Sequence, residues 1–280
     1  MTDLIPASFV FHQSNLQAFR TCRYSFLLRY VRKLRWPAPL AVRTSSFEKD
    51  LVAGSTLHSL THQYFLGIEP ALLVSCAANF PDSRVSVWFN NFLGSQYAKL
   101  AANQYPEHTL QITLNGSLLL AKFDLISFEE DFIYIYDWKT SRVLPKRQFL
   151  QDRIQTMVYT LVAARAQSQV SRPVIMHYWE ADFPDLPITF EMDDAQLLRY
   201  EESLTDLINN IHSLNIEDFE RTTDSKKCAY CEYQSYCARW GTEADGESLY
   251  EWFEIGLSEL DGNTNSELGE FPGTHWLIIK

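Results

Sequence analysis

Hydrophobic and polar residues alternate along the middle of the chain, which is typical of β-strands. Residues 109–114 and 117–127 alternate on either side of an Asn115-Gly116 pair. This arrangement predicts a β-hairpin with a type I′ turn. A further strand is expected to end at Asp137. Residues 173–181 and 188–191 predict a second hairpin later in the chain.

Helical patterns surround these strands. Ser14 is expected to cap a helix over residues 15–33, which the segment Trp36-Pro37-Ala38-Pro39 would end. Other helices are predicted over residues 47–65, within an insert from about 70 to 104, over residues 148–167, and from a cap at Asp193 or Asp194 to about residue 214. This order of strands and helices predicts an α/β fold, in which helices flank both faces of a mixed central sheet.

Two carboxylates and an amine fall within the predicted strands. Asp124 lies on the strand over residues 117–127, and Asp137 and Lys139 lie two residues apart on the next one. Two carboxylates in one place suit Mg²⁺ or Mn²⁺, which also accept phosphate oxygens as ligands. With a lysine to neutralise charge, they indicate a metal-dependent site that cuts phosphodiester bonds. The alternative is an edge hairpin with solvated charges, because the D-x-K triplet alone is common by chance.

The turn that joins the Asp124 strand to the Asp137 strand tests this geometry. If residues 129–130 form a two-residue turn, Asp124 lies opposite Ile135 and is the diagonal neighbour of Asp137. Lys139 then shares that face, because side chains two residues apart on a strand point the same way.

Neighbouring helices add polar candidates. His58 could bring an imidazole to the ion, although a lone histidine is more often a surface or core residue. Gln151, Gln155 and Tyr159 recur every four residues and form one polar stripe. Such a stripe is usually solvent-facing, but this one directly follows the D-x-K strand and could face the site.

Cysteine spacing gives a second candidate centre. Cys228, Cys231 and Cys237 form a C-x2-C-x5-C cluster, and Cys22 stands alone near the N-terminus. Four thiolates suit either an iron–sulfur cluster or a zinc site, and the spacing does not separate the two. Disulfides are a third option, but without a secretory signal we expect a reducing cytoplasm. Cys76 is predicted to be a small buried residue.

The ordered set of motifs resembles the PD-(D/E)XK nucleases of the RecB-like branch. The set runs Gly54-x3-His58, Asp124, Asp137-Trp138-Lys139 and Gln155-x3-Tyr159, between Cys22 and the C-terminal cysteines. It is most similar to the iron–sulfur exonucleases typified by the CRISPR-associated adaptation nuclease and by the nuclease domains of helicase–nuclease complexes. The resemblance covers about residues 14–240, and it departs at Ala121, where many relatives carry glycine.

The resemblance implies a role for each residue of the set. It implies that His58, Asp124, Asp137 and the Trp138 carbonyl hold Mg²⁺ or Mn²⁺, that Lys139 is catalytic, that Gln155 and Tyr159 organise the site and contact DNA, and that Cys22, Cys228, Cys231 and Cys237 hold a [4Fe–4S] cluster. Zinc is the alternative occupant of the cysteine site.

Net charge is the feature that argues against nucleic acid. The chain carries −11, whereas a general DNA-binding protein is basic. Residues 20–43 nevertheless contain no acid, and their cations form a candidate DNA-binding patch: Arg20, Arg23, Arg29, Arg32 and Lys33. Residues 241–280 carry nine acids against one lysine, so −8 of the −11 belongs to this acidic tail. The tail is either a solubilising surface, a flap over the patch, or a docking segment for a partner.

Together these features predict one α/β PD-(D/E)XK domain over residues 1–240, with a helical insert and a four-cysteine appendage, followed by the acidic tail over residues 241–280. The expected function is Mg²⁺- or Mn²⁺-dependent cleavage of DNA by a cytoplasmic single-strand exonuclease of DNA repair, recombination or CRISPR adaptation. One alternative is a DNA-binding or scaffold subunit of a helicase–nuclease or integration complex, and another is a zinc-stapled interaction protein with a vestigial site. The sequence has no GxxxxGK[ST] loop, so a helicase motor would come from a partner.

Overall fold

The computed structural model describes residues 4–34, 42–100, 103–167 and 172–239, apart from the side chains of residues 42–48. The predicted break at residues 36–39 and the acidic tail lie outside these residues. In chain order the elements are β1 (Val10–His12), α1 (Gln13–Thr21), α2 (Arg23–Phe26), the π-helical turn η1 (Leu27–Val31), α3 (Val42–Phe65), α4 (Pro70–Ala78), α5 (Ser83–Gly94), η2 (Gln96–Lys99), β2 (Gln104–Leu114), β3 (Ser117–Phe128), β4 (Ile133–Lys139), α6 (Arg147–Gln151), α7 (Ile154–Arg165), β5 (Val174–Glu180), β6 (Ile188–Met192), α8 (Asp194–Ser213), η3 (Ile216–Asp218), η4 (Ser225–Cys228) and α9 (Gln234–Cys237).

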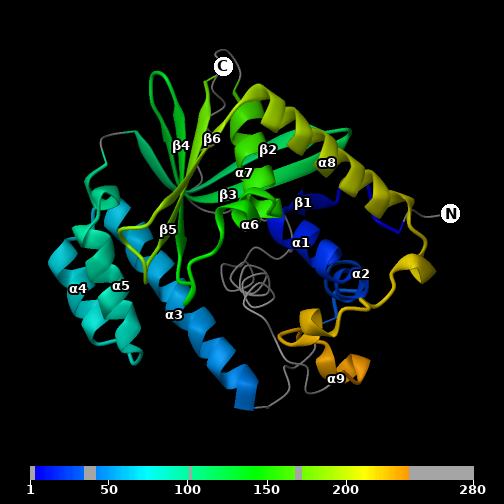
Figure 1. The fold of residues 1–280 in the computed structure, drawn as a ribbon, viewed down its shortest axis with the longest axis horizontal. Coiled ribbons are helices and arrows are strands. Elements are labelled where there is room, and N and C mark those ends of the chain that lie inside the picture. The colour runs from blue at the N-terminus through cyan, green and yellow to red at the C-terminus, as the bar shows by residue number, and fades with distance from the viewer. Residues whose placement is uncertain (1–3, 35–41, 101–102, 168–171, 240–280) are drawn as a thin grey trace.

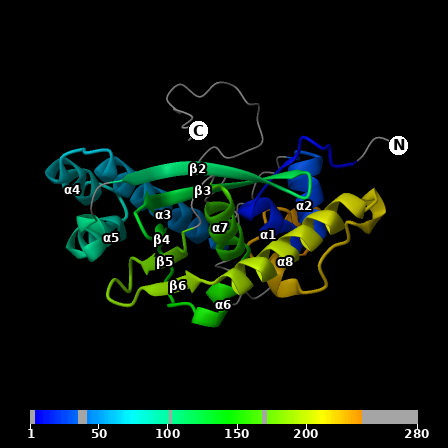
Figure 2. The same cartoon turned by 90° about the horizontal axis from the view of Figure 1, so that it is seen from above.

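The strands form one mixed sheet, as predicted. Its order is β1-β3-β4-β5-β6, and β2 pairs with the other edge of β3. The β1–β3 and β4–β5 pairs are parallel, whereas β2–β3, β3–β4 and β5–β6 are antiparallel. Seen from above, β2 and β3 cross the molecule as one long hairpin (Figure 2).

Helices cover both faces of the sheet, and each face has its own hydrophobic core. On one face α1, α7 and α8 pack against residues such as Phe123, Ile126 and Ile135. On the other face α3, α4 and α5 pack against residues that include Trp138 and Trp179. Figure 1 shows these two groups of helices on opposite sides of the strands. The sheet is therefore buried from both sides, and the end of β4 lies between the two layers.

The three predicted hairpins are present, but the turn of one differs from the expectation. Asn115 and Gly116 have φ values of 47° and 83°, as a type I′ turn requires. The β3–β4 turn spans residues 129–132, because Phe128 pairs with Ile133. The prediction of a two-residue turn at 129–130 was wrong, since neither glutamate readily adopts the positive φ of such a turn.

Two predicted helices are each interrupted. The first starts at Gln13 and not after Ser14, because the Asn15 side chain accepts from the His12 N–H at 3.0 Å. It breaks at Cys22, whose backbone is extended with φ −159° and ψ 110°. The helix predicted over residues 148–167 breaks in the same way at Arg153, with φ −77° and ψ 145°. Gln151 therefore lies on α6, and the stripe predicted with Gln155 and Tyr159 is divided between two helices.

The remaining helical predictions are confirmed. The insert forms α4, α5 and η2. Asp193 caps α8, because its side chain accepts from the backbone N–H of Gln196 at 2.6 Å. Among the described helices, none combines the length and the apolar composition that crossing a bilayer would require.

Candidate active site and cysteine centre

One edge of β3 changes its pairing partner at the candidate active site. β1 pairs with residues 118–120 and β4 pairs with residues 125–128, so residues 121–124 lie between the two partners. β4 continues past its last pair with β3, which leaves a backbone N–H that needs an acceptor. Asp124 supplies it, because its Oδ2 accepts from the N–H of Trp138 at 2.8 Å. The fork between the strands therefore fixes Asp124 beside the end of β4.

Asp137 and Lys139 form a buried ion pair at this fork. Lys139 Nζ lies 2.5 Å from Asp137 Oδ2, and the two side chains are 4% and 1% exposed. The other oxygen, Oδ1, accepts from the side-chain amide of Gln155 on α7 at 2.8 Å. A charge so deeply buried is tolerated only with its partner. The pair thus holds a carboxylate and an ammonium group together in a site that largely excludes water.

His58 reaches the same carboxylate cluster from α3. Its Nδ1 lies 3.1 Å from Asp124 Oδ1. Burial alone would raise the pKa of Asp124, but the pKa lies below its usual value because the charge of His58, its hydrogen bond to Asp124, the Lys139 charge and the Trp138 N–H outweigh burial. Asp124 is therefore ionised at neutral pH and suited to bind a cation.

Gln155 and Tyr159 on α7 are both buried, so the solvent-facing interpretation of their stripe is excluded. Gln155 holds Asp137, as described above. The Tyr159 hydroxyl accepts from the side-chain amide of Gln13 at 3.3 Å, and its ring packs against Phe123 with 5.0 Å between centroids. Tyr159 thus supports the residue next to Asp124 and links α7 to α1.

Glu107 is a site residue that the sequence reasoning missed. It lies on β2 opposite Asp124, between the pairs Pro106–Leu125 and His108–Phe123, and has an unusual φ of 52°. Its carboxylate lies 2.5 Å from Lys122 Nζ. Burial, and then the charge of Asp124, raise the pKa of Glu107. Counting the hairpin register back from Gly116 beyond residue 109 would have found it.

Glu180 is a second missed carboxylate. It pairs in register with Lys139 across β4 and β5, and it is fully buried. Its Oε2 accepts from the backbone N–H of Ser141 at 3.2 Å. No local signal could have found it, since the register of two parallel strands joined through helices depends on tertiary packing.

The two carboxylates at the fork suit Mg²⁺ or Mn²⁺ by their chemistry, because both ions prefer oxygen ligands. In the arrangement described, the carboxylate oxygens already contact protein groups, namely Lys139, Gln155, His58 and the Trp138 N–H. Among the described residues, no group of three or more His, Cys, Asp or Glu side chains is placed to hold a metal ion as it stands. A cation would therefore have to displace part of this hydrogen-bonded network.

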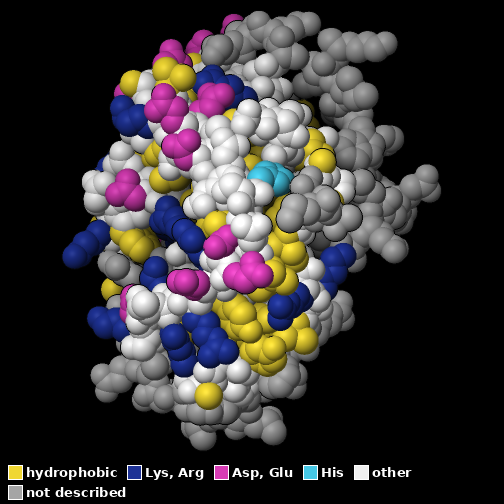
Figure 3. Space-filling model, turned by 90° about the vertical axis from the view of Figure 1, so that its right-hand side faces the viewer, with side chains coloured by type: hydrophobic (Ala, Val, Ile, Leu, Met, Phe, Trp, Pro, Cys, Tyr) yellow, Lys and Arg dark blue, Asp and Glu magenta, His cyan; other side chains and the backbone are white. Residues whose placement is uncertain are grey.

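The predicted basic patch does not form one uniform surface. Arg29 pairs with Glu232 at 2.9 Å and its side chain is only 11% exposed. Arg23 lies over the ring of Phe19, whereas Arg32 and Lys33 are exposed. Figure 3 shows acidic and basic side chains interspersed on one face of the molecule. On this face (Figure 3), the described cations are therefore divided into local groups by acidic side chains.

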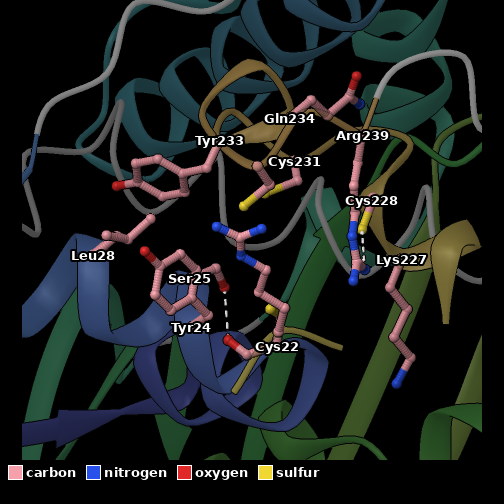
Figure 4. Close-up of a pocket in the computed structure, with 12 residues that line it drawn as sticks. Cys22, Tyr24, Ser25, Leu28, Lys227, Cys228, Cys231, Tyr233, Gln234 and Arg239 are labelled. Atoms are coloured by element: carbon pink, nitrogen blue, oxygen red, sulfur yellow. Dashed lines mark hydrogen bonds between the residues drawn. The ribbon is translucent and has the colours of Figure 1, made fainter. Parts of the chain in front are cut away.

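The four predicted cysteines meet in one pocket. Cys22, Cys228, Cys231 and Cys237 all line it, although Cys22 is about two hundred residues from the others in sequence. Figure 4 shows Cys22, Cys228 and Cys231 with Tyr233 and Arg239 around this space. Cys22 lies at the break between α1 and α2, so the interruption of the first helix positions its side chain.

Two of the sulfur atoms accept hydrogen bonds from neighbouring residues. The Thr222 N–H donates to Cys22 Sγ, and the Arg239 guanidinium donates to Cys228 Sγ, both at 3.5 Å. Burial raises the pKa values of Cys231 and Cys237. A metal that binds thiolates would offset this cost, so the donor set fits a thiolate-ligated metal. Cys76 is exposed on α4, and the prediction that it is buried was wrong.

A mixed sheet with a carboxylate–lysine site at the end of one strand defines a class of nuclease folds. The chain belongs to the PD-(D/E)XK nuclease superfamily, whose family model matches residues 11–238. A solved protein from Eubacterium rectale, described as a "Putative exonuclease", is 11% identical with a TM-score of 0.52 over 85% of this chain and 90% of its own. The protein SSO0001 is 17% identical over 83% and 87% of the two chains, with a TM-score of 0.36. No curated protein matches the sequence.

Proposed function

We propose that this protein is a metal-dependent deoxyribonuclease that acts as an exonuclease on single strands. The observation that carries the proposal is the meeting of Asp124, Asp137 and Lys139 at the fork between β3 and β4. Superfamily membership supports it, because PD-(D/E)XK nucleases usually use Mg²⁺ or Mn²⁺.

Each residue at the fork has a distinct proposed role. His58, Asp124, Asp137 and the Trp138 carbonyl would hold the Mg²⁺ or Mn²⁺ ion, which supplies an activated water and stabilises charge on the phosphate. Lys139 would neutralise the charge that develops on the phosphate oxygens. Gln155 keeps the Asp137 carboxylate in one orientation through its 2.8 Å hydrogen bond. Tyr159 supports this arrangement from the core.

The cysteine centre is proposed to hold a [4Fe–4S] cluster. Four thiols line one pocket. Four thiolates can ligate either a [4Fe–4S] cluster or one zinc ion, and the cluster is preferred because the flanking nuclease motifs resemble those of the iron–sulfur branch. Absorption of visible light by protein purified without oxygen distinguishes the two occupants.

The finer assignment follows the resemblance in the sequence. We propose a place in the RecB-like branch, near the CRISPR-associated iron–sulfur exonucleases, and a cytoplasmic role in DNA repair, recombination or CRISPR adaptation. A helicase or an integration complex would deliver the DNA. The alternative is a DNA-binding or scaffold subunit of a helicase–nuclease or integration complex, in which the four-cysteine site is structural and cleavage needs the partner. Such a subunit would bind DNA with Mg²⁺ or Mn²⁺ but would not cut it alone.

A cleavage assay tests the proposal. Protein purified without oxygen is incubated with end-labelled single- and double-stranded DNA in Mg²⁺, in Mn²⁺ and in EDTA. We expect stepwise shortening of the single strand with either ion and none in EDTA. Asp137→Asn should slow cleavage by more than about a thousandfold, because it removes one ligand of the ion.

The matched control is Asp206→Asn, an exposed aspartate on α8. It should cut at the wild-type rate. Equal cleavage by the Asp137→Asn protein and the wild-type protein would overturn the site assignment. Binding without cleavage under every metal condition would favour the scaffold alternative.

A further inference from the structure

A second polar recess lies beside the candidate active site, between α1 and α6. It is called the α6 groove below. Its volume is about 300 Å³, and its described lining residues are Gln17, Arg20, Lys146, Gln148, Phe149, Asp152 and Arg153. The lining thus combines three cations and one aromatic ring with a single carboxylate. Both α1 and α6 lie next to α7 in Figure 1.

The side chains of the groove are available to a ligand to different degrees. Lys146 is exposed, and within the described part of the chain no hydrogen bond or ion pair engages its ammonium group. The Arg20 guanidinium donates to the backbone oxygen of Asp152 at 3.2 and 3.3 Å. The Asp152 carboxylate accepts from Gln148 at 2.7 Å. The groove therefore keeps a positive character, because its three cations outnumber its single carboxylate.

The end of α6 and the residue that follows it, which adjoin the groove, have well-satisfied backbone carbonyls. Thr156 Oγ1 donates to the Leu150 oxygen at 2.5 Å, and the Tyr200 hydroxyl donates to the Gln151 oxygen at 2.8 Å. Arg20 holds the next carbonyl, that of Asp152. Three elements thus fix three successive carbonyls. A segment held this way presents its side chains in one geometry and loses little entropy when a ligand binds.

The same segment connects the groove to the catalytic residues. Arg153 ends the segment and caps α7, two residues before Gln155, which donates to Asp137. The Arg153 guanidinium carbon lies 5.6 Å from the centre of the Phe149 ring. Burial, and then the charge of Asp137, raise the pKa of Tyr178, and the nearby charges of Arg153 and Lys139 oppose this rise. The α6 groove and the fork are therefore connected by the short stretch of chain from Arg153 to Gln155.

We propose that the α6 groove holds a nucleotide of single-stranded nucleic acid adjacent to the bond that is cut, with Arg20 and Lys146 on its phosphates and Phe149 against its base. The assignment rests on the proposed nuclease function for the identity of the neighbouring site. Cations that track phosphates and an aromatic ring that stacks on a base are the two features by which proteins hold single strands. An unpaired base is required, because the ring can stack only on a face that is not already covered by a neighbouring base pair.

Binding in EDTA tests the groove separately from cleavage. Fluorescence anisotropy is measured with a labelled single strand, as DNA and as RNA of the same sequence, and with a DNA duplex. Phe149→Leu keeps apolar packing but loses stacking, and it should weaken single-strand binding by roughly 5- to 150-fold with little effect on the duplex. Lys146→Ala should lower the slope of log Kd against log salt by about 0.7, the value for one phosphate contact on a single strand. The polymer that the wild-type protein binds more tightly identifies the source of the strand.

Lys99→Ala is the charge-matched control, because Lys99 is an exposed lysine on η2, next to the core on the opposite face of the sheet. It should leave the slope unchanged, and Phe149→Tyr should restore binding. Wild-type affinity in Phe149→Leu and Lys146→Ala, or equal losses on single strand and duplex, would overturn the groove. Loss of binding in these variants of a protein that does not cut would support the groove while refuting the proposed nuclease activity.

Discussion

Asp137 and Lys139 are two residues apart on β4 and form an ion pair of 2.5 Å that is almost completely buried. The same two groups are the proposed metal ligand and the proposed catalytic cation. Stability and chemistry therefore depend on one contact, and a substitution at either position alters both. Variants of this pair have to be interpreted with their folding free energy measured alongside their activity.

The first prediction separates these two effects. Asp137→Asn should lower the free energy of unfolding by roughly 3 to 5 kcal/mol, because it removes one charge of a buried ion pair. The double variant Asp137→Asn with Lys139→Met should recover much of this loss but no cleavage. Urea denaturation followed by circular dichroism measures the free energy of unfolding of the wild type and of both variants. A single variant as stable as the wild type would show that the pair is open to water in solution.

The second prediction concerns acid stability and His12. This side chain is 5% exposed and, among the described residues, neither ring nitrogen has a hydrogen-bond partner. Burial lowers the pKa of His12 from 6.5 to about 4. Its contribution to stability is present above pH 6.5 and is lost as pH falls towards 4, since the unfolded chain takes up the proton first.

His12→Phe should remove this contribution. We compare the loss of unfolding free energy between neutral pH and about pH 4 in the two proteins. This loss should be about 3 kcal/mol smaller in the variant than in the wild type. Some pH dependence should remain, because burial also lowers the pKa of His177 to about 4. Denaturant titrations at matched ionic strength measure both slopes. Identical slopes would mean that His12 is hydrated.

The third prediction concerns the four thiols. Cys22→Ala should bleach the visible absorption of anaerobically purified protein and lower the melting temperature by several degrees, because the centre ties α1 to the C-terminal part of the domain. Cys76→Ala is the control and should change neither, since Cys76 is exposed on α4. A colourless wild-type protein with one zinc per chain would show that the centre holds zinc and not a cluster. Full metal retention in Cys22→Ala would remove Cys22 from the centre.

The fourth prediction concerns the missed carboxylate on β2. Glu107→Gln should raise the Mg²⁺ concentration for half-maximal cleavage by about tenfold, because it removes a negative charge opposite Asp124. Glu202→Gln, an exposed site on α8, is the control. The two Mg²⁺ titrations are compared at constant ionic strength. Superimposable titration curves would show that Glu107 does not affect Mg²⁺ binding and only forms an ion pair with Lys122.

The fifth prediction concerns the acidic tail, which carries −8 of the net charge. A chain ending after Trp240 should bind single-stranded DNA more tightly at low salt, because repulsion of the phosphates is reduced. The gain should shrink as salt screens the charges. Anisotropy measured across a range of salt concentrations tests this. Equal affinity at every salt concentration would leave the tail as a solubilising surface.

Local signals predicted those parts of the fold that a few adjacent residues determine. Asn115 and Gly116 fixed a turn that only residues tolerant of positive φ can form, and Asp193 fixed the start of α8 through one side-chain hydrogen bond. The Asp124, Asp137 and Lys139 set was predictable for a related reason. A register error of two residues keeps side chains on the same face, so the wrong turn length still brought the two aspartates together.

The missed features depend on contacts between distant segments. Cys76 lies in an apolar run that predicts burial, but only the packing of α4 decides which of its sides meets the core. The break at Arg153 follows from a segment that Tyr200 and Arg20 hold from two other helices. Likewise, the dispersal of the basic patch depends on Glu232, which meets Arg29 from the far end of the domain.

The cysteine pocket also sets an order of events while the protein is made. Cys22 leaves the ribosome early, whereas the residues that meet it around Thr222 and Cys237 emerge only when most of the chain has been synthesised. The Tyr233 hydroxyl donates to the Leu34 oxygen at 2.8 Å and closes the same loop. The pocket can therefore form only after synthesis has passed Cys237. A metal held by all four thiols would occur only in chains whose synthesis has passed Cys237. A chain truncated before Cys237 would lack one of the four thiols.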